Sequence, residues 1–251
     1  MTPPTLKDPR DIAMFLDFDG TLVEIAETPD AVRLADTTRA TLTRLQILLD
    51  GALAVVTGRE IAVVDAMLAP FRCPVAGVHG LTRRDAGGET HDTHVTACLL
   101  DVTEQKLRAL AARNPGLLVE RKSHAIAIHY RGNPALGPMC LAAMEEIARL
   151  DDQVRLVKGK MVIEAHPTGS DKGTAVADFM GEPPFAGRRP FFAGDDVTDE
   201  DAFRVVNGLD GITLKIGGGE SSARFRMSDT AAFLRWLGHT AETLERGHRI
   251  G

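Results

Sequence analysis

Three short stretches of the chain are apolar at almost every position, and they constrain the fold more than any other feature. These stretches are IAMFLDF (12–18), ALAVVTG (52–58) and the part PFFAG (190–194) of RPFFAGDD (189–196), which ends in two aspartates. A strand with one wet face alternates apolar and polar residues, whereas a strand covered on both faces is apolar nearly throughout. The segment 36–50 between the first two has leucines at helical spacing. The alternation predicts an α/β fold, in which helices cover both faces of a parallel sheet.

The pattern changes after Gly80 and returns near residue 171. In between, the sequence predicts a helix, a hairpin, a second helix and a second hairpin, at 97–113, 117–131, 134–150 and 153–167, with the last turn at Gly159-Lys160. This order is typical of an α+β module with an antiparallel sheet. We therefore expect a Rossmann-like core of residues 1–82 and 168–251, with residues 83–167 inserted as a second domain.

Composition narrows the class of partner. The 251 residues carry a net charge of −6 and no run of lysine or arginine, which disfavours nucleic acid and anionic membranes as partners. The three cysteines form no CxxC pair, as suits a reducing compartment. The N-terminal segment MTPPTLKDPRD lacks the apolar stretch of a signal peptide. We expect a cytoplasmic protein that binds a small molecule.

Polar residues follow the ends of the predicted strands. Asp17 and Asp19 follow the first strand, Thr57-Gly58-Arg59 the second, and Asp195, Asp196 and Asp199 the strand at 189–194, while Lys172 begins a helix. In parallel α/β sheets, ligands bind beyond the carboxyl ends of the strands. Singly, each group has an ordinary explanation: turn former, helix cap at Thr57, solvated lysine, acidic helix start or loose calcium loop. Together, at one edge of a sheet, they predict an active site.

These residues resemble a known family. DFDGTL, VVTGR, SDKGTA and AGDDVTDEDAF are similar to the four motifs of the haloacid dehalogenase-like (HAD) phosphohydrolases, across the whole core. GVHGLTRR, VERKSHAIAIHYR and MVIEAHPTGSDKG further resemble the trehalose-6-phosphate phosphatases. The resemblance implies a HAD-like core with an α+β cap, and a phosphoric monoester hydrolase that converts trehalose 6-phosphate to trehalose and phosphate.

The resemblance also implies a role for each core residue. Asp17 is expected to be the nucleophile that forms an aspartyl-phosphate, and Asp19 the acid/base. Mg²⁺ is the expected cofactor, held by Asp17, the backbone carbonyl of Asp19, and Asp195. Asp196 and Asp199 are expected to hold metal-bound waters or to orient Lys172. The expected catalytic groups that bind phosphate oxygens are Thr57 and Lys172, with the amide of Gly58. The other groups expected around the substrate are Gly20, Arg59, His79 and Gly80.

The predicted hairpins of the insert each have a polar face. Strand alternation places Glu120 and Lys122 on one face of the first hairpin, and Arg155 with Glu164 on one face of the second. Such a face is either an ordinary solvated surface or a binding surface for a neutral, hydroxyl-rich sugar, whose OH groups both donate and accept hydrogen bonds. The family resemblance places Glu120, Lys122, Arg131 and Glu164 in the sugar-binding role.

Two other functions stay open from the sequence. One is a phosphatase or mutase for another sugar phosphate, such as mannosyl-phosphoglycerate, sucrose phosphate or a hexose phosphate. The other is a non-catalytic sugar-phosphate sensor, although such a protein normally lacks one of the two aspartates, and both are present here. The resemblance also leaves room for functional pairing with a separate trehalose-6-phosphate synthase.

Overall fold

The chain divides into two compact units. The computed structural model describes residues 4–6, 8–24, 32–92, 97–121, 125–150, 154–159, 161–167 and 170–248. One unit comprises Met1–Asp92 and Ser170–Gly251, and the other comprises Thr93–Gly169. The first unit is therefore discontinuous in sequence, and the second is inserted into it.

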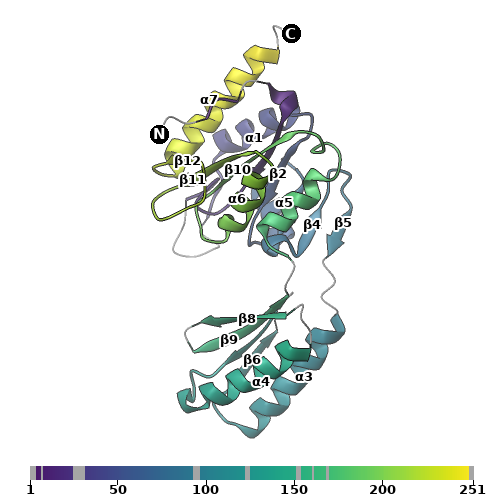
Figure 1. The fold of residues 1–251 in the computed structure, drawn as a ribbon, viewed down its shortest axis with the longest axis vertical. Coiled ribbons are helices and arrows are strands. Elements are labelled where there is room, and N and C mark those ends of the chain that lie inside the picture. Colours follow the sequence, from purple (N-terminus) through teal and green to yellow (C-terminus); the bar gives the residue numbers. More distant parts are fainter. Residues whose placement is uncertain are drawn as a thin grey trace. The chain divides into compact units, whose positions relative to one another are not determined.

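An eight-stranded sheet forms the centre of the discontinuous unit (Figure 1), in the order β12-β11-β10-β1-β2-β3-β4-β5. The bounds are β1 (Ile12–Leu16), β2 (Leu53–Val56), β3 (Val75–Gly77), β4 (Thr82–Arg84), β5 (Thr90–Asp92), β10 (Arg189–Gly194), β11 (Ile212–Ile216) and β12 (Phe225–Met227). Neighbours from β12 to β3 pair in parallel. β1 lies between β10 and β2 and is buried at every position, as its continuous apolar sequence predicts.

Strands β4 and β5 extend this sheet beyond the boundary expected from sequence. Both pair antiparallel, β4 with β3 and β5 with β4. The unit therefore continues to Asp92, ten residues beyond the predicted end at 82. Arginines hide this strand in the sequence: Arg84 forms a two-bonded ion pair with Asp65, at 2.6 and 2.8 Å. Because its charged residues form ion pairs, β4 does not show the apolar pattern from which a strand is predicted.

Helices cover both faces of the sheet. They are α1 (Asp36–Leu48), α2 (Ile61–Leu68), α5 (Lys172–Met180), α6 (Asp199–Gly208) and α7 (Thr230–His248), and a short 3-10 turn, η1 (Pro9–Asp11), precedes β1. Two adjacent residues of β10 show which helices lie on which face of the sheet, because successive side chains of a strand point to opposite faces. Phe191 stacks on Trp236 of α7 at 5.3 Å, whereas Phe192 meets Phe203 of α6 edge-on at 5.7 Å. Hence α6 and α7 lie on opposite faces.

The inserted unit is a four-stranded antiparallel sheet with two helices, in the order β6-β7-β9-β8. Its elements are α3 (Ala97–Arg113), β6 (Leu118–Arg121), β7 (Ile126–His129), η4 (Pro134–Leu136), α4 (Gly137–Leu150), β8 (Val154–Gly159) and β9 (Val162–Pro167). The helices cover one face, where Val119, Ile128 and Ile163 pack into a core with Met144 of α4. The order of elements confirms the predicted α+β module.

The second hairpin differs from its predicted register. A turn at Gly159-Lys160 would pair Lys158 with Met161, but Gly159 pairs with Val162 instead. Met161 adopts a left-handed φ of 64°, whereas Gly159 does not have a positive φ. The partner of Glu164 is consequently Val157 rather than Arg155. A shift of two residues keeps each side chain on its face, so Arg155 and Glu164 still share one.

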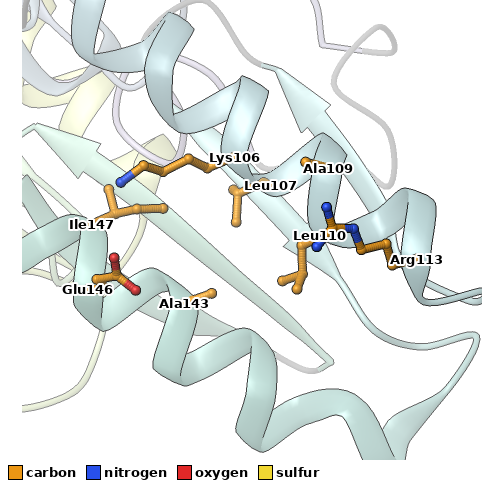
Figure 2. A pocket seen from close by; sticks show the side chains of 8 residues that line it. All are labelled: Lys106, Leu107, Ala109, Leu110, Arg113, Ala143, Glu146 and Ile147. Atoms are coloured by element: carbon orange, nitrogen blue, oxygen red, sulfur yellow. The ribbon is translucent and has the colours of Figure 1, made fainter.

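A pocket of about 330 Å³ opens between α3 and α4 of the inserted unit (Figure 2). It is lined by Lys106, Leu107, Ala109, Leu110, Arg113, Ala143, Glu146 and Ile147. None of the predicted sugar-binding residues lines this pocket.

Within the described residues, no helix combines the length and apolarity needed to cross a bilayer.

Candidate active site

The central strands bring the predicted core residues to one edge of the large sheet. The parallel register sets Leu16 at the end of β1 beside Ala193 of β10 and Val55 of β2. Asp17 continues the ladder, because its amide donates to the carbonyl of Ala193 at 3.0 Å. The segments after all three strands therefore begin side by side, as the rule for parallel sheets predicts.

A buried lysine joins two buried carboxylates at this edge. Lys172 Nζ donates to Asp17 Oδ1 and to Asp199 Oδ1, at 2.7 Å each. The three side chains are at most 5% exposed. Burial alone would lower the pKa of Lys172, but the charges of Asp17 and Asp199 outweigh it and raise that pKa. Lys172 thus stays protonated and supplies a fixed positive charge.

Asp17 is a buried carboxylate that its surroundings make difficult to ionise. Burial raises its pKa to about 8, and repulsion from Asp199 adds to this, while Lys172 acts in the opposite direction. Burial and Asp199 also raise the pKa of Asp195. Two carboxylates that both resist ionisation need another positive charge nearby if they are to be ionised near neutral pH.

The donor set fits a hard divalent cation. Carboxylate oxygens of Asp17, Asp195 and Asp199 all lie within 4.8 Å of one another. Asp195 Oδ1 is buried and has no hydrogen-bond partner among the described residues. A buried oxygen of this kind suits a metal ligand, and an all-oxygen set suits Mg²⁺. Asp199 takes the third place in this group, and the side chain of Asp19 is not part of it.

Two glycines make room for these carboxylates. A Cβ on Gly20, whose φ is +75°, would lie 2.0 Å from Asp195 Oδ2. A Cβ on Gly194 would lie 2.2 Å from Asp199 Cγ. Side chains at either position would displace a carboxylate of the cluster. The glycine in DFDGT is therefore required by the close approach of Asp195 as well as by its backbone conformation.

Asp19 is held by an arginine from the next strand end. Arg59 donates from Nε to Asp19 Oδ2 at 2.6 Å and from Nη2 to Asp19 Oδ1 at 2.7 Å. The guanidinium also lies 5.8 Å from the ring centre of Phe18. Arg59, which was expected among the substrate-binding groups, is bound to Asp19 in the structure. Thr57 does not cap α2, whose N-cap is Glu60.

The turn after β3 completes this edge of the site. The largely apolar run PVAGVHG (74–80), which has a strand-like sequence, forms a strand only as far as Gly77, and residues Val78–Gly80 form a 3-10 turn, η3. His79 donates its backbone N–H to the carbonyl of Thr57 at 2.9 Å. Its imidazole covers Gly58, where a Cβ would lie 2.6 Å from Nε2. The two residues predicted here, His79 and Gly80, thus adjoin the Thr57 loop.

Of the four residues of the inserted unit that were predicted to bind the sugar, the structure describes three. Glu120 and Glu164 lie in one row of the sheet, each paired with Ala127 of β7. This row is on the face opposite the one that α3 and α4 cover. Glu120 Oε2 lies 2.8 Å from His129 Nε2. Arg131 is exposed after β7, and Lys122 lies outside the described residues.

Comparison with known proteins decides the family. The family model described as trehalose-phosphatase matches residues 15–231. The protein named trehalose-6-phosphate phosphatase of Escherichia coli (strain K12) is 40% identical over 94% of this chain and 90% of its own length. The chain belongs to the trehalose-phosphatase family. The family resemblance inferred from the motifs is confirmed.

Solved structures confirm the fold of this trehalose-phosphatase family member. The trehalose-6-phosphate phosphatase of Aspergillus fumigatus superposes with a TM-score of 0.74 at 21% identity, covering 93% of each chain. A HAD-superfamily phosphatase from Bacteroides thetaiotaomicron superposes with a TM-score of 0.59 at 13% identity, covering 96% of this chain and 98% of its own. The predicted HAD-like core with an inserted α+β cap is therefore confirmed as the fold.

Sequence reasoning missed two residues that hold the acidic loop of this family member. Gly194 makes room for Asp199, as described above, and Lys215 of β11 is buried and donates to the backbone carbonyl of Asp195. Lysine in the otherwise apolar strand GITLKIG was the available signal. A buried lysine requires an acceptor, and the acceptor here is the turn that carries the acidic residues.

Proposed function

We propose that this protein hydrolyses trehalose 6-phosphate to trehalose and phosphate, with Mg²⁺ as cofactor. The buried Lys172–Asp17 pair beside Asp195 and Asp199 carries the proposal, because it provides a nucleophile, a fixed positive charge and oxygen ligands for a cation at one point. The name of the 40% identical Escherichia coli relative supports the choice of substrate. A separate synthase in the cytoplasm would supply the substrate.

The chemistry proceeds in two displacements. Asp17 attacks phosphorus while the bond from phosphorus to the sugar oxygen breaks, and Asp19 gives its proton to that oxygen. An aspartyl-phosphate results. Water then attacks the phosphorus, Asp19 takes a proton from it, and the carboxylate of Asp17 is released with inorganic phosphate. Each proton lost by Asp19 in the first step returns in the second.

The groups around Asp17 and Asp19 would bind the phosphate and the metal ion and would form no covalent bond. Lys172, Thr57 and the Gly58 amide would bind oxygens of the phosphate. Asp17, Asp195 and the backbone carbonyl of Asp19 would hold Mg²⁺, which cancels the repulsion between a carboxylate and a phosphate dianion. Asp199 fixes Lys172 by the 2.7 Å hydrogen bond. Its Oδ2 also accepts from the Asp196 amide at 2.8 Å, so it orders the loop that carries Asp195.

A substrate panel tests the proposal. Phosphate release is measured from trehalose 6-phosphate, sucrose phosphate, mannosyl-phosphoglycerate, glucose 6-phosphate and p-nitrophenyl phosphate, with and without Mg²⁺. The expected result is the highest kcat/KM for trehalose 6-phosphate. A higher value for another sugar phosphate would reassign the substrate within the same chemistry, and binding without release of phosphate would favour a sensor.

Selectivity for the sugar is expected to depend on Glu120 and Glu164. Glu120 is exposed and Glu164 is half-buried. A bound sugar would cover both, and a covered polar group that the ligand leaves unpaired costs roughly 1–3 kcal/mol. The double variant Glu120→Ala, Glu164→Ala should then lower kcat/KM for trehalose 6-phosphate by about a hundredfold or more. Hydrolysis of p-nitrophenyl phosphate, which has no sugar to contact these residues, should change less than about threefold.

The control for this variant removes two carboxylates from a helix of the same unit. Glu145 and Glu146 of α4 are exposed, and α4 packs on the opposite face of the sheet. Glu145→Ala with Glu146→Ala should leave both substrates unaffected. Equal losses on both substrates in the Glu120, Glu164 variant would indicate a role in folding, and no loss on either would indicate a solvated surface.

A further inference from the structure

We propose that the turn Val78–His79–Gly80 is a positioning element that holds the two phosphate-binding segments in register. The first segment is the Thr57 loop after β2, and the second is the N-terminus of α5 with Lys172. The inference rests on the proposed function, which assigns phosphate binding to these two segments. It concerns the backbone of the turn, and so differs from the direct substrate contact expected of His79.

The turn adopts a conformation that its residues disfavour. Val78, His79 and Gly80 have φ values of 49°, 56° and 97°. Only glycine enters this region freely, and a β-branched residue such as valine is an outlier there. Val78 is the only β-branched residue among the described non-glycine residues with positive φ. Strain of this kind persists only where the surroundings fix it, and it clusters at functional sites.

On one side the turn fixes the Thr57 loop. The backbone N–H groups of Val78 and His79 donate to the carbonyls of Arg59 and Thr57, at 3.0 and 2.9 Å. Because the peptide unit is planar and trans, holding the Thr57 carbonyl also sets the direction of the Gly58 N–H, which points the opposite way. That N–H is one of the groups proposed to bind phosphate, so the turn sets the orientation of a phosphate-binding group.

On the other side the turn packs against the start of α5. A Cβ on Gly80 would lie 2.6 Å from the carbonyl oxygen of Asp171 and 3.1 Å from Ser170 Oγ. Asp171 caps α5 by accepting the N–H of Thr174 at 2.8 Å, and Lys172 is the next residue. Any displacement of Asp171 by the turn would therefore move Lys172.

Gly80→Ala tests the inference, with Gly88→Ala as its matched control. Both glycines have positive φ, 97° and 87°, but a Cβ on Gly88 has nothing within 4 Å. Both variants carry the same type of backbone strain, and only Gly80→Ala presses on Asp171. Displacing a catalytic group by about 1 Å costs up to about a hundredfold in rate.

Three quantities are measured with Mg²⁺ present: kcat/KM for trehalose 6-phosphate, kcat/KM for p-nitrophenyl phosphate, and the inhibition constant of inorganic phosphate. Gly80→Ala should lower both kcat/KM values in parallel, by about tenfold to a hundredfold, and weaken inhibition by phosphate. Gly88→Ala should change each less than about twofold. Because p-nitrophenyl phosphate and inorganic phosphate lack a sugar, a role of the turn in sugar binding alone would leave them unchanged.

A second variant covers the case in which Gly80→Ala does not fold. Gly80→Asn carries the same Cβ but tolerates positive φ better, so it should fold and show the same weakened inhibition by phosphate. Folded Gly80 variants that bind phosphate as well as Gly88→Ala would overturn the inference while the proposed function stands. A wild-type protein that neither hydrolyses these esters nor binds phosphate would overturn both.

Discussion

Asp17→Asn is expected to lower turnover of trehalose 6-phosphate by at least about a thousandfold, since loss of a nucleophile removes most of the rate enhancement. An amide oxygen cannot form the aspartyl-phosphate, although asparagine has the shape of aspartate. Fold should be retained, because the substitution removes a buried carboxylate whose ionisation burial opposes. Lys172 also keeps its second partner, Asp199, at 2.7 Å. The melting temperature should stay within about 4 °C.

Trapping the intermediate makes this result specific to the nucleophile. Acid-quenched wild-type protein should show a phosphorylated peptide that contains Asp17 by mass spectrometry, and Asp17→Asn should not. Asp36→Asn is the matched control, because Asp36 is an exposed carboxylate in the first turn of α1, and it should behave as wild type. Substantial turnover by Asp17→Asn, or phosphate on a different residue, would contradict the assignment.

Removal of divalent metal should silence the protein completely. Carboxylate oxygens of Asp17, Asp195 and Asp199 lie within 4.8 Å of one another. The single positive charge of Lys172, which contacts Asp17 and Asp199, cannot neutralise all three. EDTA should therefore abolish phosphate release from every ester in the panel, and added Mg²⁺ should restore it. Ca²⁺ should restore little, because it prefers more ligands and longer bonds and would disturb the alignment of the attacking oxygen.

A binding measurement separates metal binding from catalysis. Mg²⁺ should raise the melting temperature of the EDTA-treated protein, because an ion that binds only the folded state stabilises it. Asp195→Asn should reduce this shift, since its Oδ1 is the buried oxygen without a partner among the described residues. Equal activity with Ca²⁺, or full activity in EDTA, would argue against the proposed Mg²⁺ site.

The part of the site that lies on the parallel strands was predictable from sequence. A run such as IAMFL is buried at every position, and the residue after it must then lie at the sheet edge. The same argument places Thr57 and Asp195 there without knowledge of any contact. The position of Lys172 at the site was predicted because it begins a helix. Its hydrogen-bond partner, Asp17, is 155 residues away in the sequence.

Contacts that depend on side-chain pairing or on unusual backbone were not predictable. Nothing in TGR shows that Arg59 binds both oxygens of Asp19, because the pair depends on the exact position of two loops. A strand pattern likewise gave no warning that Val78 adopts a φ of 49°, since valine normally favours strands. Charged residues hid β4, and the turn that contains Met161 shifted the register of the second hairpin by two residues.

The split of the first unit into two chain segments has a consequence for biosynthesis. Asp17, the proposed nucleophile, directly follows β1, and β1 pairs with β10, which starts only at Arg189. The nascent chain therefore carries Asp17 through the synthesis of the whole inserted unit, whose own strands and helices are contiguous in sequence and free to fold as a unit first. A chain interrupted anywhere before Lys172 holds Asp17 without its positively charged partner. The proposed phosphoryl transfer therefore requires synthesis to continue past Asp195 and Asp199, which complete the carboxylate cluster.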